Sequence, residues 1–144
     1  MSHFLTLVLV DSAEPDPGSR ATSMMMKYFA RDPFDEDGQE IADWKCDGFV
    51  IGGRYDGMIW GKEQHYNLRP DEFQRRYGLD VVQPADNIRP VPQLVPDLLP
   101  FALVLPDGSW VDCEGLPDEE WRKAVQDLFA EHRERIAVAI DCHC

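Results

Sequence analysis

Apolar residues gather in a few short runs along the chain, and each run predicts a strand. "HFLTLVLV", residues 3–10, is apolar at nearly every position, which is typical of an interior strand covered on both faces. "FALVLPDGSWVDCEG", residues 101–115, has two apolar runs around Asp107 and Gly108, a pair that favours a tight hairpin turn. "IAVAI", residues 136–140, predicts a short buried strand close to the end of the chain.

Three further segments predict helices. Residues 21–31 repeat apolar side chains at helical spacing, and Ser19 precedes them as a candidate cap. Residues 69–78 predict a short helix with proline in its first turn and glycine beyond its end. Residues 117–136 predict a long amphipathic helix with acids in its first turn. The apolar faces are Ala21, Met24, Met25, Tyr28 and Phe29 in the first helix, and Trp121, Val125, Leu128 and Phe129 in the last.

The order of these elements predicts an α+β fold. Residues 49–51 and 58–60 indicate two more short strands, joined through the glycine-rich "GGRYDG". Five prolines within residues 84–100 exclude a regular helix and a central strand there, so that segment should be an extended chain. We expect a single domain over residues 1–144, built as a two-layer sandwich with a mixed β-sheet and the two main helices on one face.

Charge excludes one class of partner. The 27 acidic residues against 14 basic ones give a net charge of -13, which repels phosphate backbones and disfavours binding in a nucleic-acid groove. Residues 32–43 carry six acidic residues and no basic one, and we call them the acidic loop. Such a surface either serves solubility alone or approaches a basic face on another protein.

The location predicted for the chain is the cytoplasm, with no membrane segment. The opening apolar run is short, has no basic region before it and no small-residue cleavage site after it. The four cysteines, in a chain without an export signal, are expected to be reduced thiols. The final "CHC" could hold zinc only if Cys46 or Cys113 converged on Cys142 and Cys144.

A first candidate site combines Asp11, Asp141 and His143. Asp11 and Asp141 directly follow apolar strands, and the two carboxylates would meet if the first and last strands paired in parallel through a right-handed crossover. Two carboxylates and an imidazole could bind a divalent ion or divide acid and base roles. The alternative is that each aspartate only ends its strand by accepting backbone hydrogen bonds.

A second candidate site is "IGGRYDG". Gly52 and Gly53 could turn backbone N–H groups toward an anion, and the planar guanidinium of Arg54 suits phosphate or carboxylate. Neither a phosphate-loop pattern nor a dinucleotide fingerprint occurs in the chain, and a purely structural turn explains the same residues.

Three segments together resemble a group of small uncharacterised proteins of bacteriophages and prophages. They are "CDGFVIGGRYDG", the "FALVLPDGSWVDCEG" hairpin and the terminal "AIDCHC". The group typically carries a "WDWYxIGGRW" segment, a later strand with a "DG" turn and tryptophan, and an end close to "VDCH". Tyr55 stands where the group has tryptophan and Gly48 replaces an aromatic residue, which reduces the surfaces for stacking a ligand. The resemblance implies a phage-type origin and a coupling of the glycine-arginine turn to the terminal Asp-Cys-His.

The leading functional hypothesis is an intracellular, phage-type binding protein that acts on a host or defence component. Its ligand would be a small anionic molecule held by Gly52, Gly53, Arg54 and Tyr55 with Asp141 and His143, or its partner a basic protein face met by the acidic loop. One alternative is a metal-dependent phosphoester hydrolase that uses Asp11, Asp141 and His143. Another is a structural or assembly component with an exposed apolar patch. No resident cofactor is predicted, and a divalent ion belongs only to the hydrolase alternative.

Overall fold

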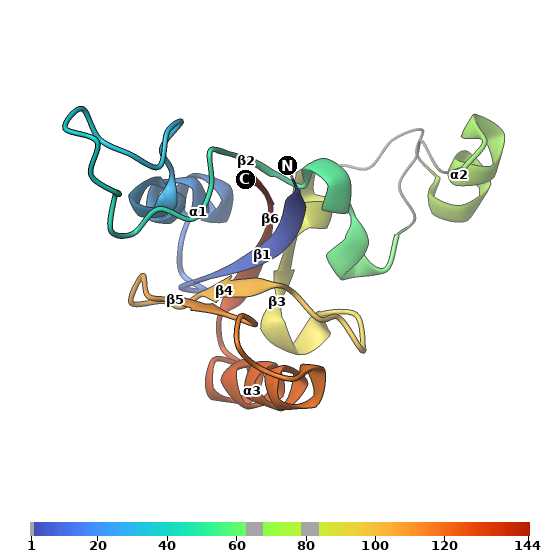
Figure 1. Cartoon of the computed structure of the whole chain (residues 1–144). Coiled ribbons are helices and arrows are strands. Elements are labelled where there is room, and N and C mark those ends of the chain that lie inside the picture. The colour runs from blue at the N-terminus through green and yellow to red at the C-terminus, as the bar shows by residue number, and fades with distance from the viewer. Residues whose placement is uncertain (1, 63–67, 79–83) are drawn as a thin grey trace.

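The computed structural model describes residues 2–62, 68–78 and 84–144, and its centre is a mixed β-sheet (Figure 1). The strand order is β2-β6-β1-β4-β5, and β3 also pairs with β6. β1 and β4 are parallel, and every other pair is antiparallel. The predicted α+β fold with a mixed sheet is therefore confirmed. The strands are β1 (His3–Val10), β2 (Gly48–Ile51), β3 (Ile88–Pro90), β4 (Ala102–Val104), β5 (Trp110–Asp112) and β6 (Ile136–His143).

The helices are α1 (Pro17–Met25), α2 (Pro70–Tyr77) and α3 (Asp118–Glu131). α1 begins at Pro17 and not at residue 21, because the Asp16 carboxylate accepts the Ser19 N–H at 3.1 Å and the Ser19 hydroxyl at 2.8 Å. Asp16, and not Ser19, is thus the cap. A 3₁₀ turn, η1 (Met26–Tyr28), extends α1.

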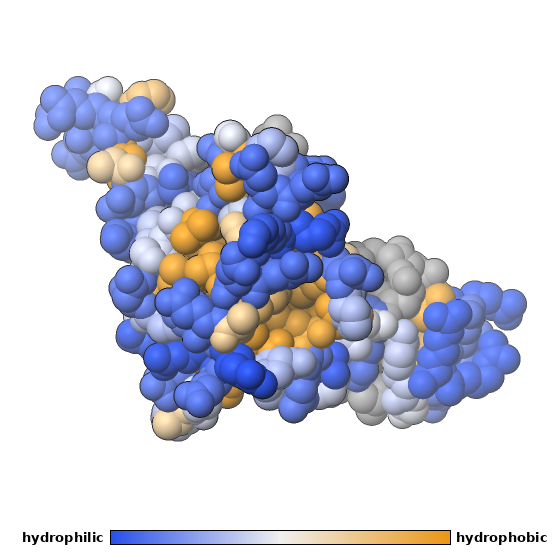
Figure 2. Space-filling view, turned by 90° about the horizontal axis from the view of Figure 1, so that it is seen from below, coloured by the Kyte–Doolittle hydropathy of each residue, from blue (hydrophilic) through white to orange (hydrophobic). Residues whose placement is uncertain are grey.

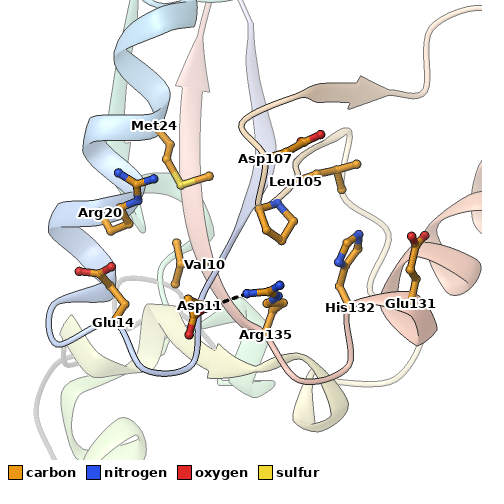
Figure 3. Close-up of a pocket in the computed structure, with 11 residues that line it drawn as sticks. Val10, Asp11, Glu14, Arg20, Met24, Leu105, Asp107, Glu131, His132 and Arg135 are labelled. Atoms are coloured by element: carbon orange, nitrogen blue, oxygen red, sulfur yellow. Dashed lines mark hydrogen bonds and ion pairs between the residues drawn. The ribbon is translucent and has the colours of Figure 1, made fainter.

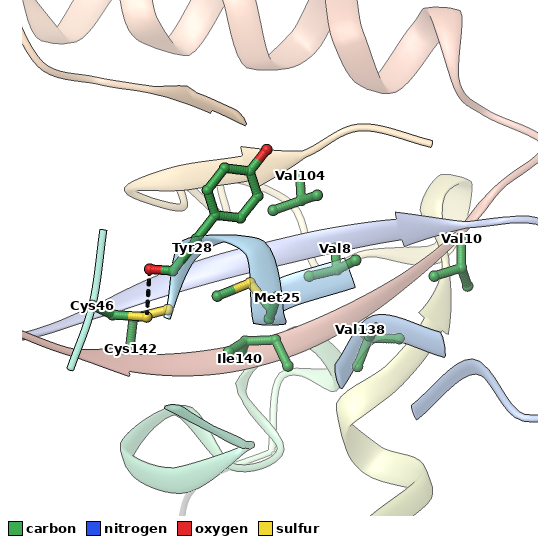
Figure 4. Packing of buried hydrophobic residues seen from close by; sticks show 10 residues of the cluster. Val8, Val10, Met25, Tyr28, Cys46, Val104, Val138, Ile140 and Cys142 are labelled. Atoms are coloured by element: carbon green, nitrogen blue, oxygen red, sulfur yellow. Dashed lines mark hydrogen bonds between the residues drawn. The ribbon is translucent and has the colours of Figure 1, made fainter. Parts of the chain in front are cut away.

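The two main helices, α1 and α3, cover opposite faces of the sheet. The prediction that both lie on one face is therefore wrong. Side chains alternate along β1, and Leu5 and Leu7 pack with Trp121 of α3, whereas Val8 and Val10 pack with Met25 of α1. Figure 1 shows α1 and α3 on the two sides of the sheet, and Figure 4 shows the α1 side of the core. The reason lies in β1 itself, whose apolar residues at almost every position allow both faces to be covered.

The last strand does lie beside the first, but it runs antiparallel to it. Val10 is paired with Ile136 at one end and His3 with His143 at the other. The crossover instead joins β5 and β6, which are parallel to each other. The 14 residues of α3 span about 21 Å, which returns the chain across the sheet before β6 begins.

One edge of the sheet is formed by two strands, β2 and β3, and the chain leaves the sheet between them. β2 pairs with the end of β6 and β3 with its beginning, and between them Gly52 N–H donates to the Ala139 carbonyl at 3.0 Å. The predicted strand 58–60 is instead a 3₁₀ turn, η3 (Met58–Trp60), because Gly57 and Gly61 on either side adopt positive φ and close the chain tightly. The proline-rich segment 84–100 contains only short 3₁₀ turns and the edge strand β3, as its composition predicts.

Candidate functional site

The "GGR" turn does bind an anion through its backbone, and that anion is Asp141 of the same chain. The Arg54 N–H donates to Asp141 Oδ2 at 2.9 Å. Gly53 has a φ of +53°, and a side-chain carbon there would overlap the Asp141 carboxylate. Gly52 has a φ of +79° and lies against Asn87 and Asp56, which are hydrogen bonded to each other at 2.7 Å. The segment is therefore both a structural turn and a backbone anion site, and Asp141 already occupies that site.

Asp141 is a buried carboxylate with a hydrogen-bond partner for each of its oxygens. Its residue is 5% exposed, and its second oxygen, Oδ1, lies 2.8 Å from Nδ1 of His3. Burying a carboxylate costs free energy unless hydrogen bonds satisfy its oxygens. The sequence reasoning missed His3, since only the antiparallel register places it beside Asp141.

His143 lies next to His3 and is paired with a different carboxylate, that of Asp47. His143 Nδ1 is 2.6 Å from Asp47 Oδ1, and the rings of His3 and His143 have centres 4.9 Å apart with 69° between their planes. The structure thus brings Gly52, Gly53, Arg54, Asp141 and His143 together at one end of the sheet. We call His3, Asp47, Asp141 and His143 the histidine–carboxylate cluster.

Tyr55, another residue of the predicted ligand site, adjoins this cluster. Burial raises the pKa of Tyr55, and the charge of Asp141 raises it further, while Arg54 opposes the shift. Tyr55 and His3 together line an open hollow of about 570 Å³ whose other walls include Leu98 and Phe101.

Asp11 does not join Asp141 and His143, so the hydrolase site predicted from these three residues does not form. Asp11 follows the carboxyl end of β1, whereas Asp141 lies opposite Leu5 near its amino end. The antiparallel register separates them. Asp11 instead accepts the Ala13 N–H at 2.8 Å and pairs with Arg135 at 3.0 Å. Among the described residues there is no group of three or more His, Cys, Asp or Glu that could hold a metal ion.

The terminal cysteines do not form the zinc site that was considered. Cys142 faces the α1 side of the core, away from Asp141 and His143, and lies 3.4 Å from the Thr6 hydroxyl (Figure 4). Cys46 does reach Cys142 there, and the hydrogen bond between the two sulfurs, followed by burial, raises the pKa of Cys142. Cys113 packs on the other face, in the α3 cluster.

A pocket of about 650 Å³ lies at the opposite end of β1 (Figure 3). We call it the carboxyl-edge pocket, because Val10 and Leu105 place it where the parallel strands β1 and β4 end. Sequence reasoning identified only Asp11 there. Its other charged or titratable residues come from the loop before α1 and α1 itself, from the β4-β5 turn, and from the end of α3 and the turn after it, segments that only the fold brings together: Glu14, Arg20, Asp107, Glu131, His132 and Arg135.

The face that carries α3 also gathers apolar side chains inside a hydrophilic rim (Figure 2). A hollow of about 170 Å³ between α3 and residues 91–99 has Leu94, Val125 and Phe129 in its wall. These side chains belong to the core clusters that hold α3 and residues 91–99 on the sheet.

Comparison with known proteins found no match for the chain among protein-family models, curated proteins or solved structures. None of the helices in the described ranges is long and apolar enough to cross a membrane.

Proposed function

We propose that the protein is a non-enzymatic binding protein that takes a small anionic ligand in the carboxyl-edge pocket. The observation that carries this proposal is a pair of arginines from different elements, Arg20 of α1 and Arg135 before β6, which line one pocket in a strongly acidic chain. Guanidinium groups offer paired donors that match carboxylate and phosphate oxygens.

Both arginines have donors to offer. The Arg20 side chain makes no hydrogen bond or ion pair with any residue within the described ranges. Arg135 uses Nη1 on Asp11, and a guanidinium has five N–H donors in all. Asp11 thereby orients Arg135 without occupying its whole hydrogen-bonding capacity.

The position and size of the pocket support the same proposal. Open sheets with parallel strands place ligands outside the carboxyl ends of those strands. The volume of about 650 Å³ lies within the range of small-molecule sites, roughly 300 to 1,000 Å³. Four acids, Asp11, Glu14, Asp107 and Glu131, also line the pocket, so the ligand that fits best combines an anionic group with hydrogen-bond donors.

A thermal-shift screen tests this proposal with inorganic phosphate, nucleoside monophosphates, amino acids and small carboxylates. A ligand at 100 times its Kd stabilises the fold by about 2.7 kcal/mol, which raises the Tm of a domain of this size by roughly 5–10 °C. Arg20→Gln should weaken that ligand about 10- to 100-fold. Arg122→Gln, the same change on the exposed side of α3, should leave it unchanged. A panel without a hit, or equal shifts in Arg20→Gln and wild type, would contradict the proposal.

The acidic loop supports a second candidate function, binding to a basic protein face. The loop projects from the body (Figure 1) and is held by the Asp35 carboxylate, which accepts the N–H groups of Asp37 and Gln39 at 2.9 Å each. Phe34 is 54% exposed within it. An exposed phenyl ring among carboxylates suits a basic surface with an apolar pocket, and for a phage-type protein that surface would belong to a host or defence component.

Reversing charge on the loop tests this second candidate. Glu36→Lys with Asp37→Lys removes carboxylates that take part in no hydrogen bond or ion pair of the loop. Pull-down from a bacterial lysate should recover basic proteins in low salt with wild type and lose them with this variant. The same double reversal at Asp127 and Glu134 should retain them. Equal recovery by both double variants would contradict this candidate.

A further inference from the structure

We propose that His3 and His143 form a two-histidine site for a divalent transition metal ion, of the Zn²⁺, Ni²⁺ or Cu²⁺ type. The proposal is independent of the carboxyl-edge pocket, which lies at the other end of β1. It rests on strand register, on the hydrogen bonds of the two rings, on their separation and on the charges around them.

Register places the two imidazoles side by side. His3 and His143 are direct partners in the antiparallel ladder of β1 and β6. Directly opposite residues project from the same face of a sheet, with β-carbons about 4.5–5.5 Å apart. The two rings are thus held by backbone hydrogen bonds and not by a loop, which is the kind of support that keeps a ligand site in shape.

Within the described ranges, the hydrogen bonds leave the same nitrogen, Nε2, available on each ring. Nδ1 of His3 lies 2.8 Å from Asp141 and Nδ1 of His143 lies 2.6 Å from Asp47. A neutral imidazole that donates from Nδ1 to a carboxylate keeps its lone pair on Nε2. Histidines that bind metals nearly always have such a partner, which fixes the ring and makes the free nitrogen a better ligand.

The separation of the rings fits one shared ion. With a metal–nitrogen bond of about 2.0–2.1 Å, two imidazoles at neighbouring positions have ring centres roughly 4.5 Å apart on an octahedral ion and roughly 5.2 Å apart on a tetrahedral one. The observed value is 4.9 Å, and the 69° between the ring planes shows that the rings do not stack.

Charge and access also favour a cation. The carboxylates of Asp47 and Asp141 would balance the two positive charges of the ion. The side chains of His3 and His143 are 27% and 29% exposed, so an ion can enter and keep water at its remaining positions. Two imidazole ligands favour transition metals, which prefer nitrogen ligands, and disfavour Mg²⁺ and Ca²⁺, which prefer oxygen ligands. Cys144 does not contribute, because strand alternation puts it on the other face, beside Ser2.

Calorimetric titration of the tag-free, metal-free protein with ZnSO₄, NiSO₄ and MgCl₂ tests the site. We expect one equivalent of Zn²⁺ or Ni²⁺ to bind and Mg²⁺ not to bind. His143→Ala and His3→Ala should each lower the affinity at least 100-fold, and Cys144→Ser should leave it unchanged. Cu²⁺ bound to wild type should show two nitrogen ligands in its paramagnetic resonance spectrum.

His3→Ala also removes a partner of buried Asp141, so a variant that keeps both histidines gives an independent readout. Asp47→Asn should weaken Zn²⁺ binding about 10- to 100-fold through the ring of His143. Asp43→Asn, the same change in the acidic loop, should not. Circular dichroism confirms that each variant is folded before titration. Absence of Zn²⁺ and Ni²⁺ binding by folded wild type, or unchanged affinity in both His143→Ala and Asp47→Asn, would overturn the proposal.

Discussion

The two ends of β1 hold the same chemical group in opposite situations. At the amino end, buried Asp141 accepts a hydrogen bond from the Arg54 N–H and lies against His3. Gly52 and Gly53 let the backbone close around its carboxylate. At the carboxyl end, exposed Asp11 pairs with Arg135 at the rim of an open pocket. A buried carboxylate must have all its hydrogen bonds supplied by the protein, whereas an exposed one can share them with water or a ligand. The first therefore organises the fold, and the second is available for binding.

The strongest test of this comparison is Gly53→Ala. The side chain would enter the space of the Asp141 carboxylate, and the φ of +53° is unfavourable for any residue with a β-carbon. We expect the free energy of unfolding to fall by about 3 kcal/mol or more. Gly48→Ala is the control, since nothing lies within 4 Å of the added carbon there, and it should change stability by no more than about 1 kcal/mol. Urea unfolding measures both, and equal midpoints would show that the turn does not close on Asp141.

Removing one charge at each end compares the two carboxylates directly. In Asp141→Asn the amide either meets a donor with its NH₂ group or forces the His3 ring into its other tautomer, so we expect a loss of about 2–3 kcal/mol of unfolding free energy. Asp11→Asn breaks only an exposed ion pair with Arg135 and should change stability by about 1 kcal/mol or less. The same urea titrations measure this difference. A larger loss for Asp11→Asn would reverse the assignment of the two ends.

Sequence reasoning could find the elements because their signals are local. The apolar run of β1, the Asp107-Gly108 turn of the β4-β5 hairpin and the apolar face of α3 each depend on neighbouring residues. The direction of β6 depends on the end of the sheet at which α3 delivers the chain. This is a long-range property that no local pattern encodes. That single error joined Asp11 to Asp141 and hid the contact between His3 and Asp141. The carboxyl-edge pocket was not predicted for a similar reason, since its walls come from three segments that are far apart in the sequence.

Thiol labelling extends the comparison to a buried and a partly exposed cysteine at the end of the chain. The hydrogen bond with Cys46 and burial raise the pKa of Cys142, which keeps it protonated and unreactive. Cys144, two residues later, is partly exposed. Iodoacetamide at pH 8 should alkylate Cys144 at least 10-fold faster than Cys142, as measured by peptide mass spectrometry. In 8 M urea the two rates should converge, and comparable rates in the native state would contradict the buried sulfur pair.

The finest test reads the charge of Asp141 through its neighbour Tyr55. Burial and then Asp141 raise the pKa of Tyr55, so the neutral phenol is favoured in the fold. This contribution to stability is present below the ordinary tyrosine pKa of about 10 and is lost as pH rises through the raised value. Ultraviolet difference titration of wild type against Tyr55→Phe isolates this group. In Asp141→Asn the pKa of Tyr55 should move back toward 10, because one of its causes is removed, whereas in Asp11→Asn it should stay where it is. Equal shifts in both variants would mean that the two carboxylates act on Tyr55 only through the total charge of the protein.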